Sequence, residues 1–155
     1  MSALSDLSFD AGIRALDLQE RAVGELRART GTLLAASSLT TSFLGAQTIS
    51  RTSSLAGFEI LALVALTVSI TVCVYVLLPK EGFVFSLNAP GVYEELYSLG
   101  NDADEIKRRL IYWLEDYRQA NQDKIDRLNE FYFGAAVALV AQLVFWSVAL
   151  AASIS

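Results

Sequence analysis

The clearest candidate for a binding site is a run of three basic residues, Lys107, Arg108 and Arg109, which is followed by aromatic residues that include Trp113. Basic side chains bind phosphate groups and an aromatic ring stacks on a nucleobase, so the cluster is a candidate anion or nucleotide site. The other interpretation is a basic helix surface near lipid phosphates or other subunits, with Trp113 in a core. The sequence leaves both open.

The remaining chemically capable residues predict neither an enzyme nor a metal site. The 155-residue chain has no histidine and one cysteine, which excludes histidine-based acid/base chemistry, His-containing zinc sites and an internal disulfide. Neighbouring carboxylates such as Glu115 and Asp116 point in different directions on a helix, so they do not converge on one bond. No serine or threonine has an activating base, and no Gly-rich phosphate loop is present.

The composition indicates a membrane protein. Apolar residues make up 54% of the chain and the mean hydropathy is +0.42, although 19% of the residues are charged. The charged residues avoid three windows, 30–50, 60–78 and 131–155, each long enough to cross a hydrocarbon core of roughly 30 Å as a helix. A soluble four-helix bundle is the alternative, but residues 60–78 lack the polar face it requires. The net charge of −5 does not suggest nucleic acid as a partner.

These windows predict an all-α membrane protein with three transmembrane helices and a cytoplasmic helical bundle. Asp10 is the expected N-cap of the first helix, and residues 101–155 are expected to form one nearly unbroken helix whose apolar stripe packs on the N-terminal helix. The expected regions are a cytoplasmic amphipathic helix at 1–29, a transmembrane hairpin at 30–78, a cytoplasmic helical region at 79–130 and a third transmembrane helix at 131–155.

The basic residues predict the orientation of this multi-pass protein in the cell membrane. Eleven of the twelve lysines and arginines fall on one side of the predicted topology, and only Arg51 falls on the other. The positive-inside rule assigns the richer side to the cytoplasm. The N-terminus and residues 79–130 are therefore expected in the cytoplasm, and the C-terminus outside.

Small and polar residues inside the apolar windows predict helix packing. Ser37, Thr41 and Gly45 recur at intervals of four, which lets helix backbones approach closely in a bilayer. We expect this weakly apolar helix to lie at the centre of the bundle or at an interface between subunits of a homo-oligomer. Gln142 is the only strongly polar side chain of the third window, and it is expected to bond another helix or to line a pore.

The layout resembles the small transmembrane effectors of bacterial Pycsar anti-phage systems. The resemblance lies in a basic helix that enters a weakly apolar span (ELRARTGTLLAASSLTTSFLGAQ), a second span ending in VYVLLP, and a charged helix (EIKRRLIYWLEDYRQANQDKIDRLNEFYF) that enters the last span. It implies an inner-membrane protein that responds to a cyclic nucleotide, cCMP or cUMP, made by a partner nucleotide cyclase. Such an effector impairs the inner membrane and kills the infected cell by abortive infection.

The chain departs from that pattern in one respect. No β-rich cyclic-nucleotide-binding domain fits, because the longest soluble stretch is about fifty residues and helical. No ligand residues are therefore carried over from the family. The alternative function is a non-enzymatic membrane scaffold that binds a cytosolic partner through its helical region.

Overall fold

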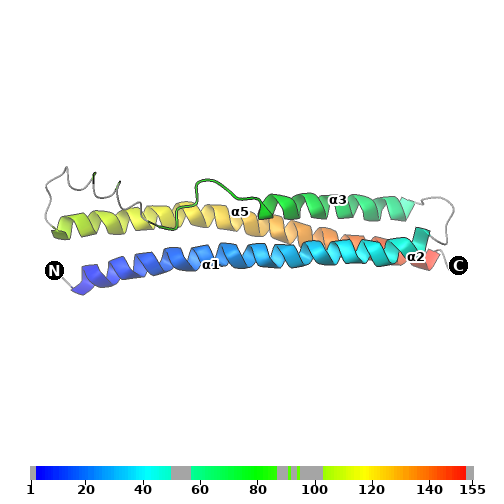
Figure 1. Ribbon diagram of the computed structural model, residues 1–155, viewed down its shortest axis with the longest axis horizontal. Helices are drawn as coiled ribbons and strands as arrows, with labels where there is room; N and C mark the ends of the chain where they lie inside the picture. Colours follow the sequence, from blue (N-terminus) through cyan, green and yellow to red (C-terminus); the bar gives the residue numbers. More distant parts are fainter. Residues whose placement is uncertain (1–2, 50–56, 87–90, 92–93, 95–102, 153–155) are drawn as a thin grey trace. The chain divides into compact units, whose positions relative to one another are not determined.

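The computed structural model describes residues 3–49, 57–86, 91, 94 and 103–152, and all regular structure within them is helical (Figure 1). The predicted all-helical class is confirmed. The turn of the predicted transmembrane hairpin, residues 51–57, lies outside the described residues except for Gly57. The elements with described bounds are the α-helices α1 (Ala3–Thr40), α2 (Ala46–Ile49), α3 (Gly57–Leu77) and α5 (Ala103–Ala152), and the π-helix η1 (Thr41–Gly45).

The first helix begins earlier than predicted. Asp10 is not an N-cap, because α1 already starts at Ala3 and contains it. Alanine and leucine before Asp10 favour helix, and Asp6 in the first turn interacts well with the positive end of the helix dipole. The predicted long C-terminal helix is confirmed in α5, which runs without a break through Glu130 and Phe131.

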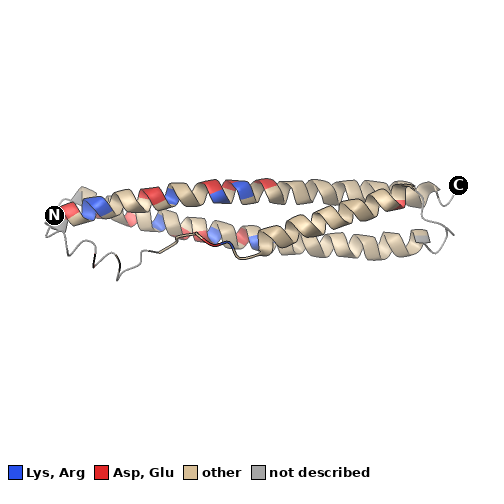
Figure 2. Ribbon diagram, turned by 90° about the horizontal axis from the view of Figure 1, so that it is seen from above, with Lys and Arg blue, Asp and Glu red and all other residues tan. Residues whose placement is uncertain are grey.

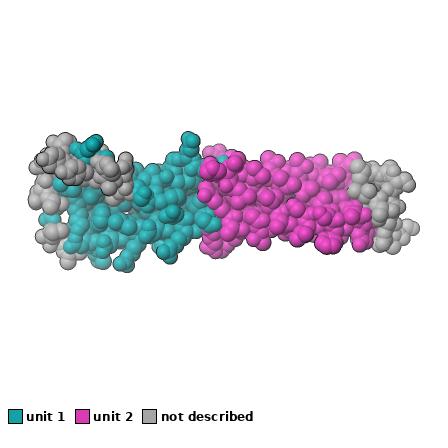
Figure 3. Space-filling model, in the orientation of Figure 1, with its two compact units in different colours: residues 1–24, 80–126 teal, residues 25–79, 127–155 magenta. Residues whose placement is uncertain are grey.

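The chain divides into two compact units, coloured teal and magenta in Figure 3. Unit 1 comprises residues 1–24 and 80–126, and unit 2 comprises residues 25–79 and 127–155. Helices α1 and α5 contribute to both units, whereas α3 belongs to unit 2 alone.

Unit 1 packs the first part of α1 against the first part of α5. Leu16 and Leu114 form its centre and are 2% and 1% exposed. Gly12 permits close packing, since a Cβ there would lie 3.0 Å from Cδ1 of Leu114. The Gln19 amide Nε2 donates to the carbonyl of Arg118 at 2.9 Å. The prediction that the N-terminal helix is the partner of the striped helix is confirmed.

Residues 80–86 are held against α5 by hydrogen bonds with two of its side chains, Asn121 and Lys124. Asn121, 1% exposed, donates from Nδ2 to the carbonyl of Val84 at 2.8 Å, and its Oδ1 accepts the Val84 N–H at 3.1 Å. Gly82 takes φ of +86°, which favours glycine, and Lys124 donates to its carbonyl. An irregular segment thus satisfies backbone groups through side chains of a neighbouring helix.

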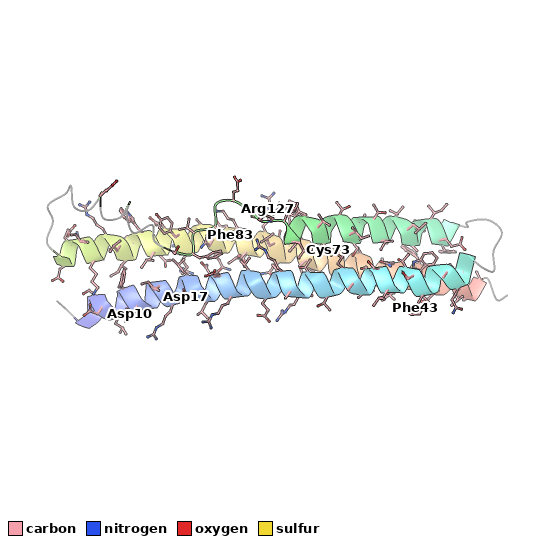
Figure 4. The ribbon with its side chains drawn as sticks, viewed as in Figure 1. Asp10, Asp17, Phe43, Cys73, Phe83 and Arg127 are labelled. Atoms are coloured by element: carbon pink, nitrogen blue, oxygen red, sulfur yellow. The ribbon has the colours of Figure 1, made fainter. Side chains whose placement is uncertain are left out.

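Unit 2 contains α3 alongside the later parts of α1 and α5 (Figure 1). Leu33, Cys73 and Ala135 form a buried cluster, one residue from each helix. Figure 4 shows Cys73 between the helices and Phe43 directed away from them, in agreement with exposures of 0% and 70%. The free thiol of Cys73 is thus a buried packing group, as its position in the apolar window predicts.

Two helices of the described chain, α3 and α5, are long and apolar enough to cross a membrane. Only 22% of the most apolar window of each is buried within the chain, whereas the core helix of a soluble protein would be mostly buried. Figure 2 shows that charged residues gather on the earlier parts of α1 and α5 and are almost absent from α3 and from the end of α5.

Candidate functional site

A layer of hydrogen bonds joins all three helices inside unit 2. The Gln142 amide on α5 donates from Nε2 to the Ser37 carbonyl at 2.9 Å and to Oγ1 of Thr41 at 2.6 Å, both on the α1 side. The Ser37 hydroxyl lies 3.2 Å from the Ser69 hydroxyl of α3. Ser69 in turn donates to the carbonyl of Ala135 at 3.4 Å. The three helices are therefore tied together by polar groups at this level.

The direction of these bonds follows from proton counting. A serine hydroxyl carries one proton, and Ser69 gives its own to the Ala135 carbonyl, which can only accept. With Ser69 as donor to Ala135, Ser37 is the donor of the bond between the two hydroxyls, in which either oxygen could donate by geometry alone. Ser37, Ser69 and Gln142 are each 0% exposed, so this layer is closed off by the surrounding helices.

The π-helical turn η1 packs closely against Trp146 of α5. A Cβ on Gly45 would lie 3.2 Å from Cη2 and 3.3 Å from Cζ2 of Trp146, a closer approach than nearly all side chains make. Trp146 follows Gln142 by four residues, so both face the same side of α5. Isolated π-turns inside α-helices are frequent at functional sites, and this one carries Thr41 and Gly45.

Unit 2 buries polar as well as apolar side chains, and its exposed surface is more apolar than that of a soluble protein. Its buried side chains include Thr30, Ser37, Thr48, Ser69 and Gln142 beside its alanines, Leu33 and Trp146. Its exposed side chains are mainly large and apolar. They include Phe43, Ile60, Val64, Val68, Leu78, Phe133, Val137, Val140 and Val144, which are 47–71% exposed. Such a surface is costly in water and favourable in lipid.

The four residues predicted for helix packing, Ser37, Thr41, Gly45 and Gln142, are brought together in this layer. Ser37 and Gly45 are buried and Thr41 is half-buried, and all three face α5 of the same chain. The parallel series of small residues, Ser38 and Ser42, is exposed on the opposite face. The packing observed here is therefore within one chain.

The predicted basic site is dispersed. Lys107 pairs with Asp6 of α1 and lies 5.8 Å from the Phe9 ring centroid, while Arg108 and Arg109 both pair with Glu105 on their own helix. Trp113 is half-buried and is not among the residues that line the groove of unit 1 described below. Each charge of the cluster thus has a carboxylate partner within unit 1.

Unit 1 carries a groove of about 440 Å³ between α1 and α5. Its floor is made of small residues, including Gly12, and its walls of Ile111, Tyr112 and Leu114, with Glu115 and Arg118 beside them. Arg118 donates to Glu115 through two nitrogens at 2.7 and 2.8 Å. These bonds, together with one from Gln119, lower the pKa of Glu115 from its ordinary value of 4.5 to about 2. Glu115 is therefore an ionised partner for Arg118 rather than a proton donor near neutral pH.

Sequence reasoning missed three residues that the structure shows to be important for packing. Ser69 was not singled out among the apolar residues of the second window, although a serine in such a window indicates a hydrogen bond to another helix. Trp146 lies four residues after Gln142, which places the two on one face. Asn121 interrupts the apolar stripe of α5, and a buried asparagine requires partners.

The described side chains offer no group of three or more acidic, cysteine or histidine residues that could hold a metal ion. No protein-family model matches the chain, and neither a curated protein nor a solved structure matches it. The functional argument therefore depends on the polarity and packing of the residues themselves.

Proposed function

We propose that unit 2 lies in a lipid bilayer and that the protein is an integral membrane protein. The observation that carries this proposal is the exposed surface of unit 2, which is made of large apolar groups while hydrogen-bonded polar groups lie inside among apolar ones. The 21 residues of α3 give a helix of about 31 Å, close to the thickness of a hydrocarbon core.

We extend this proposal to three spans at 30–50, 60–78 and 131–155. The first span is less apolar than the others and does not pass the length and hydropathy measure that α3 and α5 pass. Its support is the arrangement inside unit 2, where Ser37, Thr41 and Gly45 meet α5 and the hydroxyl of Ser37 meets α3. A helix with such partners is partly shielded from lipid and needs less apolar surface.

The proposed orientation places the N-terminus and residues 79–130 in the cytoplasm and the C-terminus outside. It follows from the concentration of lysine and arginine around these parts of the chain. With this orientation, unit 1 with its ion pairs and groove is the part that meets cytoplasmic ligands or partners.

For the biological role we propose a non-enzymatic membrane effector of bacterial antiviral defence. In this role the protein impairs inner-membrane integrity when a partner cyclase makes a cyclic nucleotide, and it assembles with further copies. The support is the resemblance in layout to Pycsar effectors together with the membrane-type polarity of unit 2. Helix α5 runs without a break through Glu130 and Phe131, and in this proposal it carries a ligand-induced change to the membrane.

The test is reconstitution of the full chain in liposomes of phosphatidylethanolamine and phosphatidylglycerol that contain a self-quenched dye. Addition of cCMP or cUMP, with and without the partner cyclase protein, should release the dye from these liposomes and not from protein-free liposomes. In cells, co-expression with an active cyclase should collapse the membrane potential, and a catalytically inactive cyclase is the control. An intact potential despite confirmed membrane insertion and nucleotide production would contradict the effector role.

A scaffold remains the second candidate because unit 1 has a groove that could receive part of a cytosolic partner. Its small floor and its Tyr112 and Ile111 walls suit an apolar side chain, and the Glu115–Arg118 pair adds polar contacts. A scaffold predicts partner binding that Gly12→Leu abolishes, with no dye release under any nucleotide. The liposome experiment therefore distinguishes the two functions.

A further inference from the structure

Nε of Arg27 is a buried atom of unit 2 without a hydrogen-bond partner among the described residues, and two further such atoms lie on fully buried residues of this unit. They are Oε1 of Gln142 and Nε1 of Trp146, and both residues are 0% exposed. A buried polar atom without a partner costs about 1–3 kcal/mol, and such atoms are rare in folded proteins. Two of them on neighbouring turns of one helix therefore point to a missing ligand between them.

The orientation of the Gln142 amide is fixed by its surroundings. Its Nε2 donates to the Ser37 carbonyl at 2.9 Å, and a carbonyl oxygen can only accept. Exchanging the amide oxygen and nitrogen would place two acceptors against each other. The Oε1 atom is consequently directed away from Ser37 and keeps unused lone pairs.

The indole of Trp146 supplies the complementary atom. Residues four apart on a helix have Cβ atoms about 5–6 Å from each other, so Gln142 and Trp146 are neighbours along α5. Gly45 packs against Cζ2 of the indole, on the ring edge adjacent to Nε1, because it has no side chain to hold the ring away. The Nε1 atom is itself buried and has no partner among the described residues.

The chemistry of the two atoms selects the ligand. The indole N–H can only donate, and the amide oxygen can only accept. A cation would be repelled by the N–H and an anion by the oxygen, whereas a water molecule accepts from the first and donates to the second.

We propose that unit 2 contains an internal hydration site in which one water molecule accepts the Nε1–H of Trp146 and donates to Oε1 of Gln142. This site continues the polar layer of Ser37, Thr41 and Ser69 toward η1. It depends on contacts within one chain, so it does not depend on the proposed role in defence. As a consequence, a bound water molecule lies inside unit 2 next to Gln142.

The experiment uses the full chain in lipid bilayers, with Trp113→Phe so that Trp146 is the only tryptophan. Tryptophan is labelled with ¹³C, and water-edited solid-state NMR measures magnetisation transfer from water to the ring carbons of Trp146. Transfer is expected at short mixing times. Gln142→Leu, which keeps an apolar side chain of similar size and removes the acceptor, should abolish it.

Thr41→Val is the matched control, because it removes a partner of Nε2 and leaves both Oε1 and the indole N–H in place. Transfer should persist in this variant. The helical circular dichroism spectrum and the Trp146 ring shifts verify that each variant is folded. Absence of transfer in the Trp113→Phe parent, or transfer that persists in Gln142→Leu, would overturn the hydration site.

Discussion

Unit 1 and unit 2 share helices α1 and α5 and differ mainly in what they expose, since both also bury polar side chains such as Asn121 and Gln142. Unit 1 buries Leu16, Leu114 and Ile125 and exposes its charges, which form ion pairs such as Arg118 with Glu115. Unit 2 buries Ser37, Ser69 and Gln142 next to its small and apolar residues and exposes valines, leucines and phenylalanines. The outward face of the same helix thus changes from polar to apolar between the two units.

The exposed side chains of a helix must suit the surrounding medium, whereas its buried side chains only have to fit the neighbouring helices. Exposed charges therefore agree with water around unit 1, and exposed apolar side chains agree with the proposed lipid around unit 2. Apolar groups inside unit 1 are stabilised by removal from water. Lipid offers no such driving force between helices, so association in a bilayer relies on close packing and hydrogen bonds. Gly45 against Trp146, and Gln142 with Ser37, supply both in unit 2.

The largest effect is expected from charges placed on the outer face of unit 2. Val140→Lys combined with Val144→Lys changes two exposed positions on α5, 59% and 52% exposed. Lysine near the centre of a membrane span costs about 2.5–3.5 kcal/mol, so the pair costs about 5–7 kcal/mol of insertion free energy. We expect the double variant to leave the carbonate-resistant membrane fraction or to be degraded.

The matched control places the same charges on unit 1. Leu7→Lys combined with Leu18→Lys changes positions that are 67% and 65% exposed, similar to those on unit 2. If unit 1 lies in water, this variant remains in the membrane fraction at the wild-type level. Equal losses from both double variants would remove the distinction between the units.

A smaller effect is expected in unit 1 from loss of the Asn121 side chain. Asn121→Ala leaves the N–H and carbonyl of Val84 without partners, which costs about 2–4 kcal/mol for the two groups. Residues 80–86 should then open more often, and trypsin should cleave after Lys80 faster than in the wild type. Asp123→Ala, at an exposed neighbouring position, should leave the cleavage rate unchanged.

Close packing in unit 2 is tested by glycine substitutions. Gly45→Ala places a methyl group about 3.2 Å from the Trp146 ring and should destabilise the protein by about 1–2 kcal/mol. Gly134→Ala, which meets nothing within 4 Å, should instead stabilise α5 by about 0.5–1 kcal/mol. SDS unfolding followed by circular dichroism measures both. A gain in stability from Gly45→Ala would show that the approach of Trp146 is not tight.

The smallest effect concerns the surface charges of unit 1. The folded-state pKa of Glu115 is about 2, below its ordinary value of 4.5, so its ion pair stabilises the fold above pH 4.5 and is lost as the pH falls through 2. The side chain is 45% exposed, and such pairs contribute only about 0.2–1 kcal/mol. Glu115→Gln should therefore lower stability slightly at pH 7 and equal the wild type near pH 2. A difference that grows toward pH 2 would contradict the assignment.

Much of the helical architecture could be predicted from the sequence. The apolar windows indicated helices. The helical spacing of apolar residues, which include Leu16 in the first helix and Leu114 and Leu128 in the last, indicated their buried faces, because periodicity reports burial directly. The start of α1 could not be predicted well, since Asp10 and Asp6 are both acceptable near a helix N-terminus. Local sequence does not say which of them begins the helix.

The candidate site was only partly accessible to sequence reasoning. Ser37, Thr41, Gly45 and Gln142 could be singled out because polar or small residues in an apolar window have few alternative explanations. Their partners Ser69 and Trp146 could not, because cross-helix register is set by packing over the whole length of the helices. The same limit applies to Lys107, whose partner Asp6 is distant in the sequence. The pair of Glu105 and Arg109, four residues apart on one helix, was accessible from the sequence.

The central claim, that unit 2 faces lipid and unit 1 faces water, is tested most directly by cysteine accessibility. In a Cys73→Ala background, Val137→Cys on unit 2 and Leu18→Cys on unit 1 place a thiol at exposed positions of both units. In inside-out membrane vesicles, a membrane-impermeant maleimide should label Leu18→Cys rapidly and should label Val137→Cys only after detergent is added. Rapid labelling of Val137→Cys in intact vesicles would contradict the account.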